Sequence, residues 1–240
     1  MNKDDLYKLA LGRGAIRLDF KNQAHIKATQ STTPLIFDLP RLVGVRKICD
    51  GIVTQIQQMR QFQKIKNDAV VVAGVGIHGA LLASAVANKN WMGAIGLDEK
   101  DPIPSKNLVA GKKIILISPL IETAETTLKS FHEITKAGGH VVLVIALFKS
   151  NLLLAEQRLN GTAGMNDRGE HICLHNPSHQ LITIFDAYEI TEAMYKHPQK
   201  TDEKNADIKK FGATLNPPFE FPKDKTEPQQ QKGATASASS

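Results

Sequence analysis

The sequence predicts an α/β protein whose central, mostly parallel sheet is flanked by helices. Residues 68–73 (DAVVVA) form a continuous apolar run, which is typical of a strand buried on both faces. Two similar runs, at 113–118 and 140–148, are separated by a segment in which apolar residues recur at helical spacing. This alternation of strands and helices predicts parallel strands joined by right-handed crossovers.

The N-terminal half supplies the first elements. Apolar side chains recur at helical spacing from Val45 to Met59, which predicts an amphipathic helix over about 44–62. A polar, irregular segment at 97–110 separates the halves. The other expected elements are a helix at about 4–11, strands at about 15–19 and 34–37, the strand at 68–73, a small-residue helix at 80–88 and a strand at 91–96.

The C-terminal half continues the alternation. Gly138 and Gly139 end a helix predicted over about 123–137. Asp186 and Glu189 have the spacing of a capping box, which predicts a helix that runs to about Lys196. The expected elements are strands at 113–118, 140–148 and 180–185, no assigned structure at 151–179, a polar stretch from 198, and disorder over 216–240, where Pro, Lys, Gln, Ala and Ser dominate.

Composition restricts the partners. The 240 residues carry a net charge of +6, which is compatible with phosphorylated small ligands. The chain has no block of five consecutive basic residues and a single tryptophan, so we expect no nucleic-acid partner. No apolar run approaches the ~20 residues that span a bilayer, and the N-terminus shows no leader, so we expect a cytoplasmic protein without membrane contact.

Two short motifs have simpler interpretations than a cofactor or metal site. Gly74-x-Gly76-x-x-Gly79 matches a dinucleotide fingerprint, but no acid ends the next strand at the expected distance, which favours a tight strand-to-helix turn. His171, Cys173 and His175 alternate and could hold a metal. A partly exposed edge strand explains them as well, and we predict no metal site there.

The segment 111–127 (GKKIILISPLIETAETT) has the layout of a phosphate-binding loop: an apolar strand, a polar turn and a helix. Together with the N-terminal strand pair and the segments 68–83, 95–107 and 182–187, it resembles the type I phosphoribosyltransferases, and within them the orotate phosphoribosyltransferases. The resemblance covers about residues 6–196. It divides the chain into an N-terminal hood at 1–44, an α/β core at 45–197 and a C-terminal extension at 198–240.

The resemblance implies a reaction between orotate and phosphoribosyl pyrophosphate (PRPP), with Mg²⁺, in a homodimer. It implies that the segment 95–107 is a catalytic loop, in which only Lys100 and Asp101 match the family in kind, and it makes Arg41 a candidate cation near the hood. The implied PRPP-binding positions are Gly74, His78 and Gly79 in a pyrophosphate loop, and Ser118, Thr123, Ala124, Thr126 and Thr127 in the phosphate loop.

The chain departs from the family where the chemistry is done. Ser118 and Pro119 stand where the family has two acids, and Ala124 stands where it has a glycine. Glu122 and Glu125 would lie beside the phosphate. We therefore expect a catalytically impaired or inactive protein that acts as a binding, regulatory or scaffold subunit, with a phosphorylated small ligand or a protein as its partner.

The alternative is a divergent but active orotate phosphoribosyltransferase. It would bind Mg²⁺, and it would take the missing acids from Asp98, Glu99 and Asp101 and a cation from Lys100.

Overall fold

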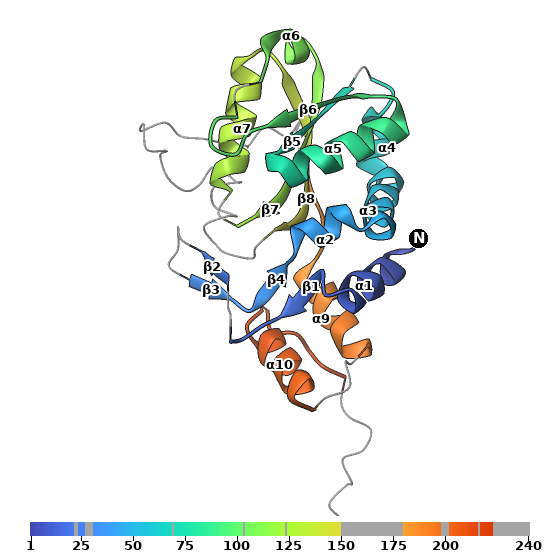
Figure 1. The fold of residues 1–240 in the computed structure, drawn as a ribbon, viewed down its shortest axis with the longest axis vertical. Helices are drawn as coiled ribbons and strands as arrows, with labels where there is room; N and C mark the ends of the chain where they lie inside the picture. The colour runs from blue at the N-terminus through green and yellow to red at the C-terminus, as the bar shows by residue number, and fades with distance from the viewer. Residues whose placement is uncertain are drawn as a thin grey trace, which may run out of the picture.

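A computed structural model of the chain (Figure 1) describes residues 1–21, 24–26, 31–68, 70–102, 104–122, 124–149, 180–197, 202–215 and 217–222. Its main sheet has five strands in the order β6-β5-β7-β8-β9, and every neighbouring pair is parallel. The predicted fold class is confirmed. The strands are β5 (Val70–Val75), β6 (Gly93–Leu97), β7 (Lys113–Ile121), β8 (His140–Lys149) and β9 (Gln180–Phe185).

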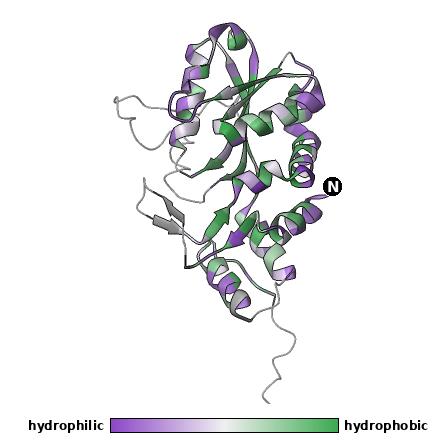
Figure 2. Ribbon diagram, in the orientation of Figure 1, coloured by the Kyte–Doolittle hydropathy of each residue, from purple (hydrophilic) through white to green (hydrophobic). Residues whose placement is uncertain are grey.

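Helices cover both faces of this sheet. Val70 and Val72 of β5 pack in one apolar cluster, with α3 (Arg46–Gln58) and α5 (Gly76–Asn90), whereas Val71 and Ala73 pack in a second cluster, with α7 (Glu125–Lys136). Because alternate side chains of a strand face opposite ways, this explains the unbroken apolar run. Figure 2 shows the same pattern, with largely hydrophobic strands between helices of mixed colour.

The segment 44–62, expected to be one helix, forms two, and a further short helix precedes them. The three helices are α2 (Leu39–Gly44), α3 and α4 (Arg60–Ile65), and the extended residues Val45 and Met59 separate them. Asp38 caps α2, since its side chain accepts a hydrogen bond from the backbone N–H of Arg41 at 3.1 Å. Periodicity alone could not reveal these breaks, because the apolar spacing continues across both of them.

Strand β7 runs three residues beyond its predicted end at Ser118. It passes through Pro119, which cannot donate a backbone hydrogen bond. The strand tolerates proline there because its pairing with β5 already ends at Ile117, while its pairing with β8 continues to Ile121. The polar turn is correspondingly shorter than the sequence indicates.

The N-terminal residues form two small antiparallel sheets beside the core. Strand β1 (Ile16–Leu18) pairs with β4 (Leu35–Phe37), and β2 (Ala24–Ile26) pairs with β3 (Ser31–Thr33). The first pair and the preceding helix α1 (Lys3–Gly12) confirm the predicted elements. Phe37 stacks on Phe148 of β8, with ring centroids 4.4 Å apart, and so anchors this hood to the main sheet.

The C-terminal elements tie back to α1. Asp186 caps α9 (Ala187–Lys196), as expected, by accepting the backbone N–H groups of Tyr188 and Glu189. Glu189, however, does not complete the capping box. Its carboxylate accepts the Tyr7 hydroxyl at 2.5 Å and pairs with Lys3 at 2.6 Å, and the Tyr7 hydroxyl accepts the Asp186 N–H at 3.1 Å.

A further helix, α10 (Asp202–Ala213), lies in the polar extension and was not predicted. Ile208, Phe211 and Leu215 are buried, and the Tyr188 hydroxyl donates to the carbonyl of Pro217 at 2.6 Å. Residues 217–222, part of the segment expected to be disordered, therefore pack against α9 and α10, while residues 223–240 lie outside the described part. The segment 151–179, with its histidines and Cys173, lies outside it too.

Candidate functional site

A cleft of about 240 Å³ opens at the carboxyl ends of the parallel strands, where α/β proteins of this kind bind ligands. We call it the strand-end cleft. It is formed by the end of β7, the start of α7, the first turn of α5 and the loop after β6. Its lining residues are Leu39, Val75, His78, Glu99, residues 118–122 and residues 124–127.

Five of the predicted site residues therefore meet in one cleft, and the others do not. His78, Ser118, Ala124, Thr126 and Thr127 line it. Gly74 and Gly79 lie behind its surface, Lys100 and Asp101 are exposed outside the lining, and Thr123 lies outside the described residues.

Ser118 and Thr127 are bonded to each other. Their hydroxyl oxygens are 2.8 Å apart, and the two residues are only 3% and 1% exposed. The bond ties the end of β7 to the first turn of α7. It also fixes both oxygens in place and occupies one of the two O–H donors at this edge of the cleft.

Ala124 keeps the backbone conformation that a glycine would adopt. Its φ is +64° and its ψ −2°, in the left-handed region, and it is 3% exposed. An L-residue there is strained by roughly 1–2 kcal/mol. The turn forms although an alanine replaces the family's glycine, and the methyl group packs in the apolar cluster beneath α7.

The charge of the cleft is negative. Glu99, Glu122 and Glu125 line it, and its described lining includes no lysine or arginine. Partial burial raises the pKa of the Glu122 carboxyl. A carboxylate about 5 Å from a phosphate charge costs roughly 3 kcal/mol at an effective dielectric constant of about 20. The cleft therefore opposes the binding of a polyphosphate.

The glycines before α5 serve packing. Strand β5 ends at Val75 and α5 begins at Gly76, with no loop between them. A Cβ atom at Gly74 would overlap the carbonyl group of Gly79, and one at Gly79 would lie 3.1 Å from the Ile117 carbonyl oxygen. Both positions thus need glycine for a close strand–helix contact, as the simpler interpretation of the motif requires.

The loop after β6 is held against the protein. The Asp98 carboxylate accepts the backbone N–H groups of Lys100 at 2.7 Å and Asp101 at 3.1 Å, and these bonds lower the pKa of Asp98. The Lys129 ammonium group donates to the Lys100 carbonyl. Glu99, between these anchors, lies against Gly76 and is the one acid of residues 98–101 that reaches the cleft.

Ser118 and Pro119, at the end of β7, offer no carboxylate to a magnesium-bound diphosphate. Ser118 offers one hydroxyl, already bonded, and Pro119 offers no polar side-chain atom, where two acids would be needed. Within the described residues, no group of three or more His, Cys, Asp or Glu side chains is placed to hold a metal ion.

In the part of the chain that the structure describes, no helix combines the length and apolar character that crossing a bilayer requires.

Solved structures share this architecture. UMP synthase from Leishmania donovani matches 90% of this chain with a TM-score of 0.63 and 17% identity, over 43% of its own length. Orotate phosphoribosyltransferase from Aeropyrum pernix matches 80% of this chain, and 98% of itself, with a TM-score of 0.57 and 14% identity. Adenine phosphoribosyltransferase from Thermoanaerobacter pseudethanolicus matches 76% of this chain, and 98% of itself, with a TM-score of 0.51 and 13% identity.

The chain has the type I phosphoribosyltransferase fold. It spans less than half of the UMP synthase chain. Neither the family models nor the curated protein sequences compared with it give a significant match. At these sequence identities the likeness shows the fold alone, and any chemistry depends on the residues of the strand-end cleft.

Among the features of this phosphoribosyltransferase fold that sequence reasoning missed are one carboxylate position and one helix. The first is the position of Glu99, which points back to Gly76, since nothing in a polar loop indicates where one carboxylate lies. The second is α10, whose signal was present: Ile208, Phe211 and Leu215 recur at helical spacing.

Proposed function

We propose that this chain is an orotate phosphoribosyltransferase-like protein that is catalytically impaired or inactive and acts as a binding, regulatory or scaffold subunit. The observation that carries this proposal is the buried Ser118–Thr127 hydroxyl pair at the end of β7. The resemblance places two acids at Ser118 and Pro119. This chain instead uses the first position to hold β7 and α7 together.

The charges of the strand-end cleft support the same proposal. Loss of a pyrophosphate group needs cations that neutralise charge as the bond breaks. Glu99, Glu122 and Glu125 supply the opposite charge, while Lys100 lies outside the lining and its carbonyl is bonded to Lys129. Electrostatics would therefore disfavour both PRPP binding and its transition state.

An active enzyme remains the second candidate because Glu99 does line the cleft. In that case Glu99 would replace one of the missing acids and would help to hold Mg²⁺. Asp98 and Asp101 do not join it, because the Asp98 carboxylate is bonded to the backbone of its own loop and Asp101 lies outside the lining.

Calorimetric titration with PRPP, with and without Mg²⁺, tests the proposal, together with an assay for orotidine monophosphate formation. We expect no binding heat at millimolar PRPP and no product. Micromolar, magnesium-dependent binding with turnover would establish the active alternative. In that event Glu99→Gln should abolish both, whereas Asp101→Asn, a matched control from the same loop, should change neither.

We also propose that the chain forms a homodimer in the cytoplasm. Ile77 and Leu81 lie one turn apart on α5 and are 72% and 52% exposed, and Trp91 is almost fully exposed. Ile77 and Leu81 form an exposed apolar pair at the start of α5, and Trp91 follows the end of the same helix; exposed apolar surface of this kind favours association. Sedimentation equilibrium should give twice the mass of the chain, and Ile77→Lys with Leu81→Lys should reduce it to the single-chain value. A wild-type monomer at 100 μM would refute the dimer.

A further inference from the structure

A second cavity, of about 480 Å³, lies between the hood and the C-terminal helices and shares no lining residue with the strand-end cleft. We call it the hood cavity. It lies where the end of α1, strand β1, the start of α2, the end of α9 and helix α10 meet. Its volume is twice that of the cleft and falls in the range of about 300–1,000 Å³ that is usual for small-molecule sites.

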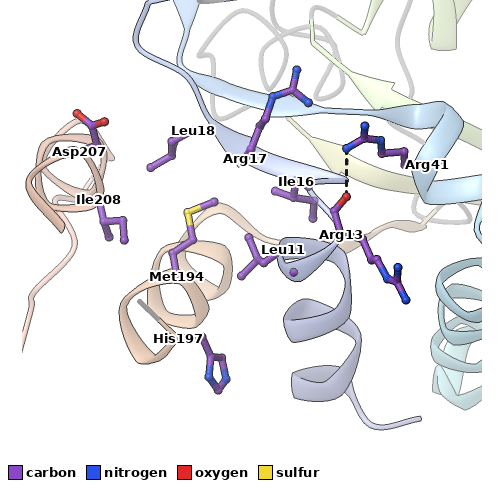
Figure 3. A pocket seen from close by; sticks show the side chains of 12 residues that line it. Leu11, Arg13, Ile16, Arg17, Leu18, Arg41, Met194, His197, Asp207 and Ile208 are labelled. Atoms are coloured by element: carbon purple, nitrogen blue, oxygen red, sulfur yellow. Dashed lines mark hydrogen bonds between the residues drawn. The ribbon is translucent and has the colours of Figure 1, made fainter. Parts of the chain in front are cut away.

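The inner wall of the hood cavity is apolar. Figure 3 shows five side chains gathered from four elements: Leu11 of α1, Ile16 and Leu18 of β1, Met194 of α9 and Ile208 of α10. Four of the five are buried and Leu18 is partly buried. Such a wall contacts the hydrocarbon part of a ligand and gives no direct preference for charge.

The charge preference comes from guanidinium groups. Arg13, Arg17 and Arg41 all belong to the lining; in Figure 3 Arg13 and Arg41 lie on the side of Ile16 that faces away from Met194, and Arg17 lies above Ile16. Asp207, on α10, is the one acid that lines the cavity among the described residues, and His197 is at the opposite end from Arg41. Cations therefore outnumber carboxylates around the cavity.

One of these arginines is fixed in place. Arg41 donates from Nη1 to the carbonyl oxygen of Arg13 at 3.2 Å, and its Nε lies 3.2 Å from Asp38 Oδ2. Arg17 lies 4.0 Å from the same oxygen. Asp38 is therefore shared by two guanidinium groups. Arg13 has no hydrogen bond or ion pair through its side chain within the described residues, which leaves its five donors available.

We propose that the hood cavity binds a small organic anion, with its apolar body against Leu18, Met194 and Ile208 and its charged end at Arg13 and Arg41. A guanidinium group matches carboxylate and phosphate oxygens through paired hydrogen bonds. Arg41, already held by Asp38 and by the Arg13 carbonyl, loses little side-chain freedom on binding. The site is independent of the proposed loss of catalysis in the strand-end cleft.

Titration of the full chain with octanoate, octyl phosphate, octanol and octylammonium tests this site. We expect the two anions to bind at least about tenfold more tightly than octanol, as one charge-assisted hydrogen bond predicts, and octylammonium to bind more weakly still. Chemical-shift changes should map to Leu18, Met194 and Ile208. The two anions together also show whether the site prefers a carboxylate or a phosphate.

Two variants make the test specific. Arg13→Glu should weaken octanoate binding about tenfold or more, and Arg13→Lys, the matched control, should keep most of it. Both changes are at an exposed side chain, so the fold should be unaffected. His78→Ala, in the strand-end cleft, should leave octanoate binding unchanged. Octanol binding equal to octanoate, an unchanged Arg13→Glu variant, or no binding of either anion to the folded protein would overturn the proposal.

Discussion

The carboxyl group of Glu99 lies directly against Gly76, the first residue of α5. Gly76 has a φ of +67°, and a Cβ atom there would overlap the Glu99 carboxylate. A helix begins with unpaired N–H groups and a partial positive charge, which stabilise a nearby anion. Here an internal carboxylate occupies the neighbourhood in which the phosphoribosyltransferase resemblance expects a ligand's pyrophosphate.

This relationship predicts the cost of a methyl group at Gly76. Gly76→Ala should destabilise the protein more than Gly111→Ala does, because Gly111 has nearly the same φ, +69°, but open space around it. We expect about 1 kcal/mol for Gly111→Ala, from backbone strain alone, and about 0.5–1 kcal/mol more for Gly76→Ala, because the exposed Glu99 side chain must turn away from the new methyl group. Urea denaturation measures both values.

Removing the carboxylate gives the control for this comparison. In a Glu99→Ala background, the excess cost of Gly76→Ala over Gly111→Ala should largely disappear. If the excess persisted there, Glu99 would not be the group that Gly76 accommodates.

The strained turn at Ala124 predicts an unusually mild glycine substitution. Ala124→Gly relieves the left-handed strain but loses one buried methyl group and gains chain entropy in the unfolded state. These terms nearly cancel, so we expect a change within about 1 kcal/mol. Ala87→Gly, at a buried site inside α5, has no strain to relieve and should cost about 1–2 kcal/mol. Equal losses in thermal melts would argue against a strained turn.

The Ser118–Thr127 pair predicts non-additive substitutions. Ser118→Ala leaves the buried Thr127 hydroxyl without its side-chain partner, and Thr127→Val does the same to Ser118. Each should cost about 1–3 kcal/mol. The double variant removes both hydroxyls, so its loss should be smaller than the sum by at least about 0.5 kcal/mol. A double-mutant cycle from denaturant unfolding measures this difference, and strict additivity would show that the hydroxyls are independent.

Tyr7 predicts a loss of stability in alkali. Burial, followed by its bond to Glu189, strongly raises the pKa of the Tyr7 hydroxyl above its ordinary value of 10. Because this pKa is higher in the folded state than in the unfolded state, the protonated Tyr7 hydroxyl contributes its full stabilisation below about pH 10. The contribution is lost as the pH rises from the unfolded-state pKa toward the folded-state pKa. Ultraviolet titration should therefore show one of the three tyrosines ionising only as the protein unfolds.

Tyr7→Phe tests the assignment of that tyrosine. The variant should lose about 1–3 kcal/mol at neutral pH, because Asp186 and Glu189 lose a buried hydrogen-bonding partner. Its stability should then fall less steeply above pH 10 than that of the wild type. A late-ionising tyrosine that survived in Tyr7→Phe would assign the behaviour to Tyr188 or Tyr195.

The parts of the fold that sequence predicted are those in which the periodicity of apolar residues is set by burial. The run 68–73 is apolar throughout because both faces of β5 are covered, and it could be read directly. The break at Met59 and the passage of β7 through Pro119 depend on where neighbouring strands and helices end, which the sequence does not state.

The candidate site was likewise predicted only in part. The resemblance indicated which residues would gather at the strand ends, and His78, Ser118, Ala124, Thr126 and Thr127 do so. It could not show that Ser118 and Thr127 would bond to each other, since that requires a distance between two side chains of different elements. The hood cavity was invisible for a related reason, because its walls come from both ends of the chain.

The Ser118–Thr127 bond also limits the order in which substitutions can accumulate. A carboxylate placed at Ser118 would be introduced into a position that is 3% exposed, beside a hydroxyl fitted to a smaller group. Such a change costs several kcal/mol unless the surroundings change first. A lineage with this pair can therefore reach an acid at the end of β7 only after Thr127 or the turn has been remodelled, which makes the present state hard to leave by single steps.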